Sequence, residues 1–279
     1  PEGVFNVVPG YGHEAGEALA LHMDVDAIGF TGSTRVGRRM LGYAGDSNLK
    51  RVFNELGGKS AFVVFDDCED LDRAARAVAG AMFFNQGESC NAPSRLLVHE
   101  SIADAVVDAV VGQTPRYQPG DPLAPQTTMG ALVDEGQLQT VLRYIEAGRS
   151  EGANCLIGGA RAREASGGYY VEPTVFDGVR NDMTIAREEI FGPVLATITF
   201  RTVAEAIEKA NNTAYGLSAG IWTEKGSRIL HVANALKAGV VWANTFNRFD
   251  PTSPFGGYKE SGYGREGGLQ GLHAYLRSS

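Results

Sequence analysis

Short apolar runs alternate with longer amphipathic segments along this chain, and the alternation limits its fold more than any other feature. Residues 27–30 and 61–65 have the length and composition of strands, and residues 15–22 and 72–84 have helical spacing. This order favours an α/β fold in which helices connect parallel strands. The further expected helices are 101–111, 135–151 and 203–211, the further strands are 4–8, 155–158, 194–200 and 240–244, and residues 118–128 are expected to form a loop.

Charge and hydropathy exclude several classes of protein. The 279 residues are 43% hydrophobic, enough for a sizeable core, and carry a formal net charge of −8. That balance argues against binding to nucleic acid or to an anionic membrane surface. No run approaches the roughly 20 apolar residues of a membrane-spanning helix, and no basic start leads into an apolar signal segment. We therefore expect no nucleic acid or membrane partner and cytoplasmic residence.

The three cysteines indicate a reducing compartment. Cys68, Cys90 and Cys155 are far apart and form no Cys-x-x-Cys pair, and the five histidines have no paired spacing, so no metal site is expected. Cys68 lies among acidic residues, whose charge is expected to raise the pKa of its thiol. Cys155 fits a short strand, so both are interpreted as structural cysteines.

Cys90 and Glu55 are the candidate catalytic pair. Cys90 ends the run NQGESC (85–90), and Glu55 begins the run ELGGK (55–59), which we expect on a loop. A thiolate is a strong nucleophile, a carboxylate can take a proton directly or through water, and the glycines at 57 and 58 leave room for a ligand. The plain alternative is a small buried cysteine and a solvated glutamate.

Residues 31–37 form a glycine and hydroxyl turn between an expected strand and an expected helix. With the strand at 4–8 and the helix at 15–22, the segment is expected to be a βαβ crossover. Backbone N–H groups and the helix dipole favour an anion at such a helix start, so the turn suits a phosphate. Glycine turns are also common at helix starts without a ligand, and this turn lacks the Gly-Lys-Ser/Thr ending of a P-loop.

Four motifs in one order give a resemblance to a known family. They are ELGGK (55–59), NQGESC (85–90), EEIFGP (188–193) and PFGGYKESG (254–262). Together they resemble the signatures of the NAD(P)-dependent aldehyde dehydrogenase superfamily, and the likeness runs from about residue 3 to 275. The resemblance implies an α/β fold with part of a Rossmann-like dinucleotide-binding domain at 1–57 and a catalytic domain at 58–240. Residues 241–279 would form the substrate-tunnel loop and a return segment towards the cofactor domain.

The resemblance also implies a cofactor, NAD or NADP with NAD favoured, and assigns residues to it. Pro9 and Gly10 match the adenine side. The positions that match the pyrophosphate turn are Gly32, Ser33 and Gly37, and those that match the nicotinamide surroundings are Leu56, Gly57, Glu189 and Phe191. For Glu189, the plain alternative is a solvated carboxylate at a helix end.

The implied reaction oxidises an aldehyde to a carboxylic acid. Cys90 would form a thiohemiacetal and then a thioester, and Glu55 would activate the water that hydrolyses it. Ser89 and Asn91 flank the nucleophile, and Phe249 and Phe255 match aromatic positions of the substrate tunnel, although such phenylalanines are often core residues. Asn91 stands where an apolar residue or threonine is usual, which could favour an aldehyde with a polar end.

Two other readings remain open. Relatives carry a longer N-terminal part, including an asparagine of the oxyanion site, so the chain is expected to be a fragment, a processed product or one that works beside a complementing segment. A non-catalytic relative without a complete cofactor site is therefore an alternative. A coenzyme A-acylating enzyme is a second, although Glu55, the usual hydrolytic base, is retained. The family implies a homo-oligomer, and the last strand that usually pairs with a neighbouring subunit would be truncated.

Overall fold

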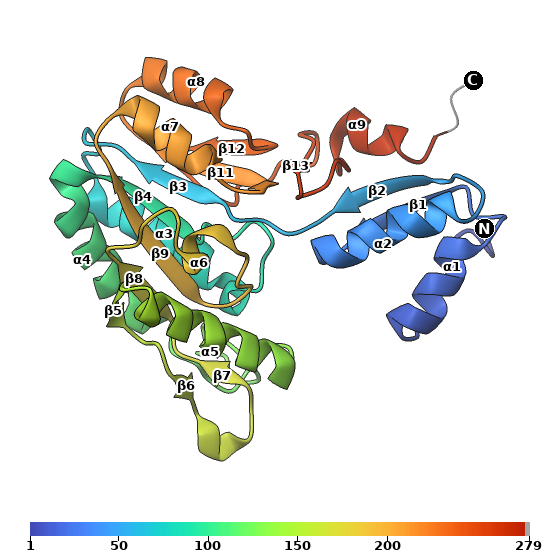
Figure 1. Ribbon diagram of the computed structural model, residues 1–279, viewed down its shortest axis with the longest axis horizontal. Helices are drawn as coiled ribbons and strands as arrows, with labels where there is room; N and C mark the ends of the chain where they lie inside the picture. Colours follow the sequence, from blue (N-terminus) through green and yellow to red (C-terminus); the bar gives the residue numbers. More distant parts are fainter. Residues whose placement is uncertain (277–279) are drawn as a thin grey trace. The chain divides into compact units, whose positions relative to one another are not determined.

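The computed structural model describes residues 1–276, and they divide into two compact units (Figure 1). The first unit comprises Pro1–Leu56 together with the chain from Asp250 onward, and the second comprises Gly57–Phe249. Each unit has its own sheet and its own buried core. The structure thus divides the chain after residues 56 and 249, where the sequence predicted boundaries after 57 and 240.

A βαβ crossover forms the centre of the first unit. Strands β1 (Ala27–Thr31) and β2 (Arg51–Glu55) run parallel, and helix α2 (Thr34–Gly45) connects them. The register places Ala27 opposite Arg51 and Thr31 opposite Glu55. The other elements of this unit are η1 (Gly12–Gly16), α1 (Glu17–Leu21), β13 (Tyr258–Lys259) and α9 (Gly268–His273).

Helix α2 forms where its sequence supplies a cap and an apolar stripe. The side chain of Ser33 accepts a hydrogen bond from the backbone N–H of Val36 at 3.4 Å, which caps the helix start. Val36, Met40 and Ala44 are spaced four apart and so share one face, which packs with Ala20 and Val52 in the core of the first unit. The burial of this face fixes the helix against the two strands.

Two sequence predictions for the first unit are wrong. Residues 4–8 are not a strand, and Val4 and Phe5 are 75% and 85% exposed. A strand needs a neighbour for its backbone hydrogen bonds, and within residues 1–276 none pairs with this segment. The crossover therefore begins with β1 instead. Glu55, expected on a loop, is the last residue of β2.

A seven-stranded sheet forms the second unit, in the order β12-β11-β3-β4-β9-β8-β5. Adjacent strands are parallel except β5, which is antiparallel to β8 at the edge. The strands are β3 (Ala61–Val64), β4 (Arg95–His99), β5 (Asn154–Ile157), β8 (Thr174–Asp177), β9 (Val194–Phe200), β11 (Ser218–Trp222) and β12 (Val240–Ala243). Central strands such as β3 are buried throughout, as expected for a parallel sheet covered on both faces.

Helices pack on this sheet in pairs. In Figure 1, α3 lies beside α4 and α7 lies beside α8. The helices are α3 (Leu71–Phe83), α4 (Ala103–Gln113), α5 (Glu135–Ser150), α6 (Thr184–Arg187), α7 (Val203–Asn211) and α8 (Gly226–Ala235). The short elements are η2 (Phe84–Gly87), η3 (Glu100–Ile102), η4 (Thr114–Arg116), η5 (Glu164–Ser166), β6 (Arg161–Ala162), β7 (Tyr170–Val171) and β10 (Tyr215–Gly216).

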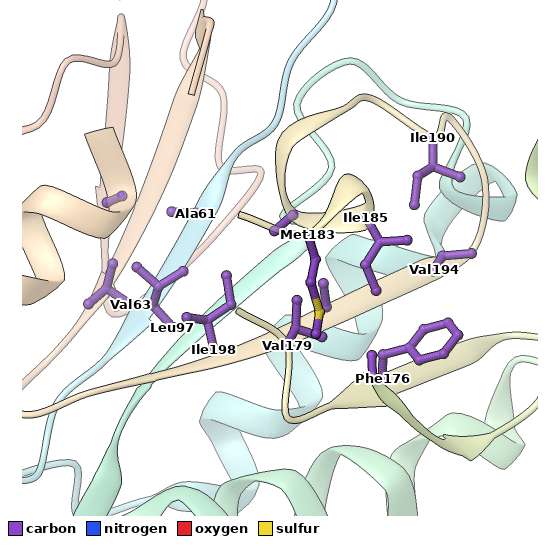
Figure 2. Close-up of a cluster of buried hydrophobic side chains, with 14 of the residues drawn as sticks. Ala61, Val63, Leu97, Phe176, Val179, Met183, Ile185, Ile190, Val194 and Ile198 are labelled. Carbon is purple, nitrogen blue, oxygen red and sulfur yellow. The ribbon is translucent and has the colours of Figure 1, made fainter. Parts of the chain in front are cut away.

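Buried aliphatic and aromatic side chains join the strands and helices of the second unit (Figure 2). Val63 of β3, Leu97 of β4 and Ile198 of β9 come from three neighbouring strands, and Ile185 and Phe176 extend the cluster towards α6 and β8. Each such side chain contributes roughly 1.5–3 kcal/mol when fully buried. This core makes the second unit a rigid support for the loops at its edge.

Arg95, at the start of β4, ties the sheet to the end of α7. Its guanidinium donates to the carbonyl oxygens of Lys59, Lys209 and Ala210 at 2.9, 2.9 and 2.8 Å. The last carbonyls of a helix lack intrahelical partners and carry a partial negative charge, so a cation stabilises them. Burial lowers the pKa of Arg95 to about 10, and the group remains charged at neutral pH.

Most predicted elements of the second unit are confirmed. Helices at 72–84, 135–151 and 203–211 agree with α3, α5 and α7 within one residue at each end, and the expected helix at 101–111 corresponds to α4 with η3 before it. The sequence analysis did not identify β4, β8, β11, α6 or α8. Of the helices in residues 1–276, none has the length and apolar character to cross a membrane.

Candidate active site

Cys90 follows a turn with an unusual backbone. After α3 ends at Phe83, Asn85 and Gln86 both have φ of 47°, in the left-handed region, and Gly87 has φ of 73°. Such conformations cost on the order of 1–3 kcal/mol for residues other than glycine, and they persist only when the surroundings hold them. The side chain of Asn85 contributes by donating to the carbonyl oxygen of Glu88 at 2.9 Å.

Two polar side chains anchor this turn to a distant segment. Gln86 Oε1 accepts from the backbone N–H of Gly130 at 3.2 Å, and Glu88 Oε1 accepts from that of Val133 at 3.1 Å. The segment before Cys90 is therefore fixed at both ends, by α3 on one side and by residues 130–133 on the other.

Gly58 allows the backbone of Cys90 to come close. A Cβ atom at Gly58 would overlap the carbonyl oxygen of Cys90, so only glycine fits there. Cys90 itself is half-buried, and the three cysteines are reduced thiols. Cys68 is buried, and burial, helped by neighbouring acidic charge, raises its pKa to about 11. The predicted direction is confirmed, although burial is the larger cause.

The residues on either side of Cys90 form a chain of polar contacts. Ser89 Oγ donates to Asn91 Oδ1 at 2.7 Å, and Asn91 Nδ2 donates to Asn247 Oδ1 at 2.6 Å. Asn91 is only 5% exposed, so its amide is committed to these partners. Asn247 has φ of 55°, a conformation that asparagine tolerates better than most residues.

A cavity of about 700 Å³ lies beside these residues, within the second unit. Ser89, Asn91 and Phe249, three of the four predicted substrate residues, line it. The ring of Phe249 packs edge-on against Trp242, with centroids 5.4 Å apart. The fourth, Phe255, belongs to the first unit, where its backbone pairs with Glu266 through two 2.7 Å hydrogen bonds.

Glu189 is oriented by the glycines of the ELGGK motif. The backbone N–H of Gly58 donates to Glu189 Oε1 at 2.9 Å, and a Cβ atom at Gly57 would overlap Oε2. Burial raises the pKa of Glu189, while this hydrogen bond and the charge of Lys59 lower it. The side chain of Glu189 is therefore fixed by a backbone hydrogen bond and is not a freely solvated carboxylate at a helix end. It can accept hydrogen bonds from ligand hydroxyls.

Lys59 is a buried cation that sequence reasoning missed. Its side chain is almost fully buried, and within residues 1–276 no group accepts a hydrogen bond from its Nζ. Burial first, and then the charge of Arg95, lowers its pKa to about 7, against the opposing effect of Glu189 and Glu188. The motif lysine was visible in the sequence, but its burial was not.

Phe191 and Leu56 differ in their surroundings. Phe191 is 38% exposed with φ of 55°, and its carbonyl oxygen accepts from Gln137 Nε2 at 2.7 Å. Leu56 is buried in the first unit, and its backbone N–H donates to the carbonyl oxygen of Ser261 at 2.9 Å. Phe191 is thus the more accessible of these two predicted cofactor residues.

Glu55 has a strongly perturbed environment in the first unit. Its side chain is 7% exposed, and its Oε1 is buried without a hydrogen-bond partner among the described residues. Burial and then the charge of Glu266 raise its pKa to about 8, although Arg265 opposes the shift. It lines a cavity of about 100 Å³ with Gly264 and Glu266. A carboxyl group with such a pKa can exchange protons near neutral pH.

Three of the predicted cofactor residues of the first unit, Gly32, Ser33 and Gly37, lie around the start of α2. Ser33 caps the helix, and Gly32 joins β1 to it with an N–H that donates to the carbonyl oxygen of Glu55 at 3.1 Å. A Cβ atom at Gly37 would lie 2.5 Å from Leu56 Cδ2, so packing also explains this glycine. Pro9 and Gly10 are exposed.

A second cavity of about 700 Å³ lies in the first unit, between α1, α2 and β1. Leu19, Ile28, Val36 and Met40 give it apolar walls, which suit a flat ring such as adenine. It adjoins the capped start of α2, which suits a phosphate. The residues present therefore fit a dinucleotide, although Pro9 and Gly10 do not line this cavity.

Comparison with known proteins identifies the family of the chain. The model of the aldehyde dehydrogenase family matches residues 1–279. The NADP/NAD-dependent aldehyde dehydrogenase PuuC of Escherichia coli is 48% identical over 99% of this chain and 55% of its own length. The aldehyde dehydrogenase KauB of Pseudomonas aeruginosa superimposes with a TM-score of 0.97 at 55% identity, over 99% of this chain and 56% of KauB.

A third match contains bound ligands. The indole-3-acetaldehyde dehydrogenase AldA of P. syringae, solved with NAD+ and IAA, has a TM-score of 0.95 at 52% identity, over 96% of this chain and 54% of AldA. The chain thus spans about half the length of the relatives it matches. With the whole sequence matched by one family model and these relatives above 45% identity, the chain belongs to the aldehyde dehydrogenase family.

Proposed function

We propose that this chain carries the catalytic pair of an enzyme that oxidises an aldehyde to a carboxylic acid with NAD(P)+. The proposal depends mainly on the loop that contains Cys90. Its backbone is strained, hydrogen bonds from Gly130 and Val133 anchor it, and Ser89 and Asn91, the residues on either side of Cys90, line a cavity. Backbone strain of this kind concentrates at functional sites. The relatives are named aldehyde dehydrogenases, which supports the same reaction.

Cys90 is the proposed nucleophile. Its thiolate attacks the aldehyde carbon to form a thiohemiacetal, and its backbone N–H is proposed to donate to the resulting oxyanion. Loss of hydride leaves a thioester on Cys90. Ser89 and Asn91 hold the loop on either side of the sulfur, so their role in this step is to keep the thiol in place.

Glu55 is the proposed general base. It takes a proton from the water that attacks the thioester, which releases the carboxylic acid and restores the thiol. Its pKa of about 8 means that the deprotonated, active form increases as the pH rises through that value. Glu55 belongs to the first unit and Cys90 to the second.

The cofactor residues are proposed on both units. The start of α2 at Ser33 and its neighbouring apolar cavity are proposed to hold the phosphates and adenine, and Glu189 is proposed to accept from ribose hydroxyls. When bound, NAD(P)+ supplies the acceptor for the hydride. NAD is favoured over NADP, as the sequence resemblance implied, and a homo-oligomer or a complementing segment remains a prediction.

NAD(P)H formation tests the proposal. The purified chain is mixed with NAD+ or NADP+ and a panel of aliphatic, aromatic and polar aldehydes, and absorbance at the NADH band is followed. Wild type and Cys155→Ala are expected to form NAD(P)H, whereas Cys90→Ala forms none. Turnover by Cys90→Ala equal to that of wild type would refute the role of Cys90. Dependence of turnover on added coenzyme A would instead identify the acylating branch.

A further inference from the structure

The cavity beside Ser89 and Asn91 carries a charge opposite to that of the chain. Arg73, Arg76 and Arg248 line it, and none of the described residues that line it is acidic. The whole chain, by contrast, has 33 acidic and 25 basic residues. We propose that this cavity binds the anionic far end of the aldehyde, so that the preferred substrate carries a carboxylate or similar anion. This inference rests on the proposed function of the same site.

One face of α3 forms a wall of the cavity. Its lining residues are Arg73, Arg76, Ala77, Gly80, Ala81 and, just after the helix, Phe84. They recur three or four apart, so they share a face. The small residues in the middle leave room for a chain, and the arginines stand at the end remote from the Cys90 loop.

The length of this wall sets the length of the ligand. From residue 76 to residue 84 a helix rises about 12 Å. An arginine side chain covers part of that distance, so the remaining space suits an extended aldehyde of medium length. A short semialdehyde would not reach the guanidinium groups while its carbonyl lies near the thiol.

The arginines are arranged to receive an anion. The guanidinium of Arg73 lies 5.7 Å from the centre of the Trp222 ring and donates to the carbonyl oxygen of Asn244 at 3.4 Å, which restrains it. Arg76 lies three residues further on and is exposed. A planar guanidinium binds a carboxylate through two parallel hydrogen bonds, so a pair on one helix face is a suitable receptor.

The other end of the cavity is polar but neutral. Ser89, Asn91 and Asn247 have uncharged side chains, and hydrogen bonds link them to one another. Asp72 precedes Arg73 in sequence, but adjacent residues on a helix point to different faces, and Asp72 does not line the cavity. Arg73 and Arg76 therefore place positive charge at the far end of the α3 wall, and Arg248, next to Asn247 in sequence, adds a third positive charge to the lining.

A first experiment compares two substrates that differ in charge at one end. Oxidation of 8-oxooctanoate and of its methyl ester is measured as kcat/KM for wild type, Arg76→Gln and Arg76→Lys. Wild type is expected to oxidise the carboxylate with a higher kcat/KM than the ester. Arg76→Gln is expected to lower this ratio roughly three- to tenfold, because the lost interaction is intermediate in strength between an exposed ion pair and a charge-assisted hydrogen bond. Arg76→Lys should retain part of the preference. Arg143→Gln, an exposed arginine of α5 outside the cavity, is the matched control.

A second experiment measures binding without turnover. The chain is titrated with octanedioate or with the neutral octane-1,8-diol, and the fluorescence of its two tryptophans is followed, because Trp222 lines the cavity. Tighter binding of octanedioate that is lost in the Arg73→Gln, Arg76→Gln double variant supports the proposal. Equal binding of the diol, or unchanged octanedioate binding by the double variant, overturns it.

The two experiments separate failure of this proposal from failure of the proposed function. If no aldehyde yields NAD(P)H while octanedioate binding still depends on the arginines, the anion site stands and the dehydrogenase function fails. If the carboxylate and its ester are oxidised equally well by wild type and by Arg76→Gln, the function stands and the anion site is overturned.

Discussion

The backbone N–H of Gly58 donates a 2.9 Å hydrogen bond to Oε1 of Glu189, and the two residues are 131 positions apart. The contact joins the ELGGK motif to the EEIFGP motif. It explains why the first motif needs consecutive glycines, because Gly57 makes room for the carboxylate that Gly58 binds, while Gly58 also admits the carbonyl oxygen of Cys90.

Substitution of Gly57 tests that relationship. In Gly57→Ala the added methyl group would overlap Oε2 of Glu189 and displace the carboxylate. We expect weaker NAD(P)+ binding, measured by calorimetry, with a far-UV spectrum like that of wild type. Gly112→Ala is the control, since no atom lies within 4 Å of its added Cβ. Wild-type affinity in Gly57→Ala would argue against a cofactor role for Glu189.

Glu55 is expected to set the pH dependence of thioester hydrolysis. Its pKa is raised to about 8, so steady-state turnover should increase as the pH rises through 8. In Glu55→Gln a burst of NAD(P)H is expected without steady turnover, because the thioester forms but is not hydrolysed. Rapid-mixing kinetics from pH 6 to 9 measures both. An unchanged profile in the variant would assign the titration to another group.

The same shift predicts a change of stability with pH. The carboxyl group of Glu55 binds its proton more tightly in the folded chain than in the unfolded chain. Its stabilising contribution is therefore complete below its pKa in the unfolded chain, 4.5, and is lost as the pH rises through its pKa in the folded chain, about 8. Urea midpoints between pH 4 and 9 should therefore fall more steeply for wild type than for Glu55→Gln. Parallel curves would contradict the raised pKa.

Two glycines of α2 are expected to respond in opposite ways to alanine. Gly37→Ala brings a methyl group to 2.5 Å from Leu56 Cδ2 and should destabilise by about 1–3 kcal/mol, as overpacking does. Gly42→Ala meets no atom within 4 Å and should stabilise the helix by roughly 0.5–1 kcal/mol. Urea unfolding measures both. Rescue of Gly37→Ala by Leu56→Val would confirm the clash, and its absence would place the cause elsewhere.

The amide pair beside Cys90 is expected to be coupled. Asn91→Ala leaves the half-buried Asn247 amide without its partner, at a cost of roughly 0.5–1.5 kcal/mol. A double-mutant cycle with Asn247→Ala, followed by urea unfolding, should give an interaction energy well above zero. Additive effects of the two substitutions would show that the 2.6 Å contact does not stabilise the loop.

Much of the fold was predictable because its patterns are local. The helical spacing at 72–84 and 203–211 and the apolar runs at 61–65 and 194–200 correspond to α3, α7, β3 and β9. Strand β11 was missed because Ser218, Ala219 and Gly220 have little strand propensity, and its pairing with β3 and β12 determines its conformation. The segment 4–8 shows the converse, since its apolar pattern forms no strand without a neighbour.

The sequence predicts which residues belong to the candidate site, but it does not predict the contacts between them. The motifs point to Cys90, Glu55 and Glu189, but the bond from Gly58 to Glu189 spans 131 positions and depends on the tertiary fold. Asn247, Arg73 and Arg76 were also missed. Arg73 and Arg76 stand three apart in a predicted helix, so their shared face follows from the spacing, but only the structure shows that this face lines a cavity.

The most direct test of the central claim follows the thiol of Cys90 itself. The chain is incubated with NAD+ and 8-oxooctanoate in the Glu55→Gln background, quenched in acid, and digested for mass analysis of the peptide that contains Cys90. The account predicts an acyl group on Cys90 that forms only when both aldehyde and NAD+ are present, and none on Cys155. Formation of NADH without any acylated Cys90 peptide would contradict it.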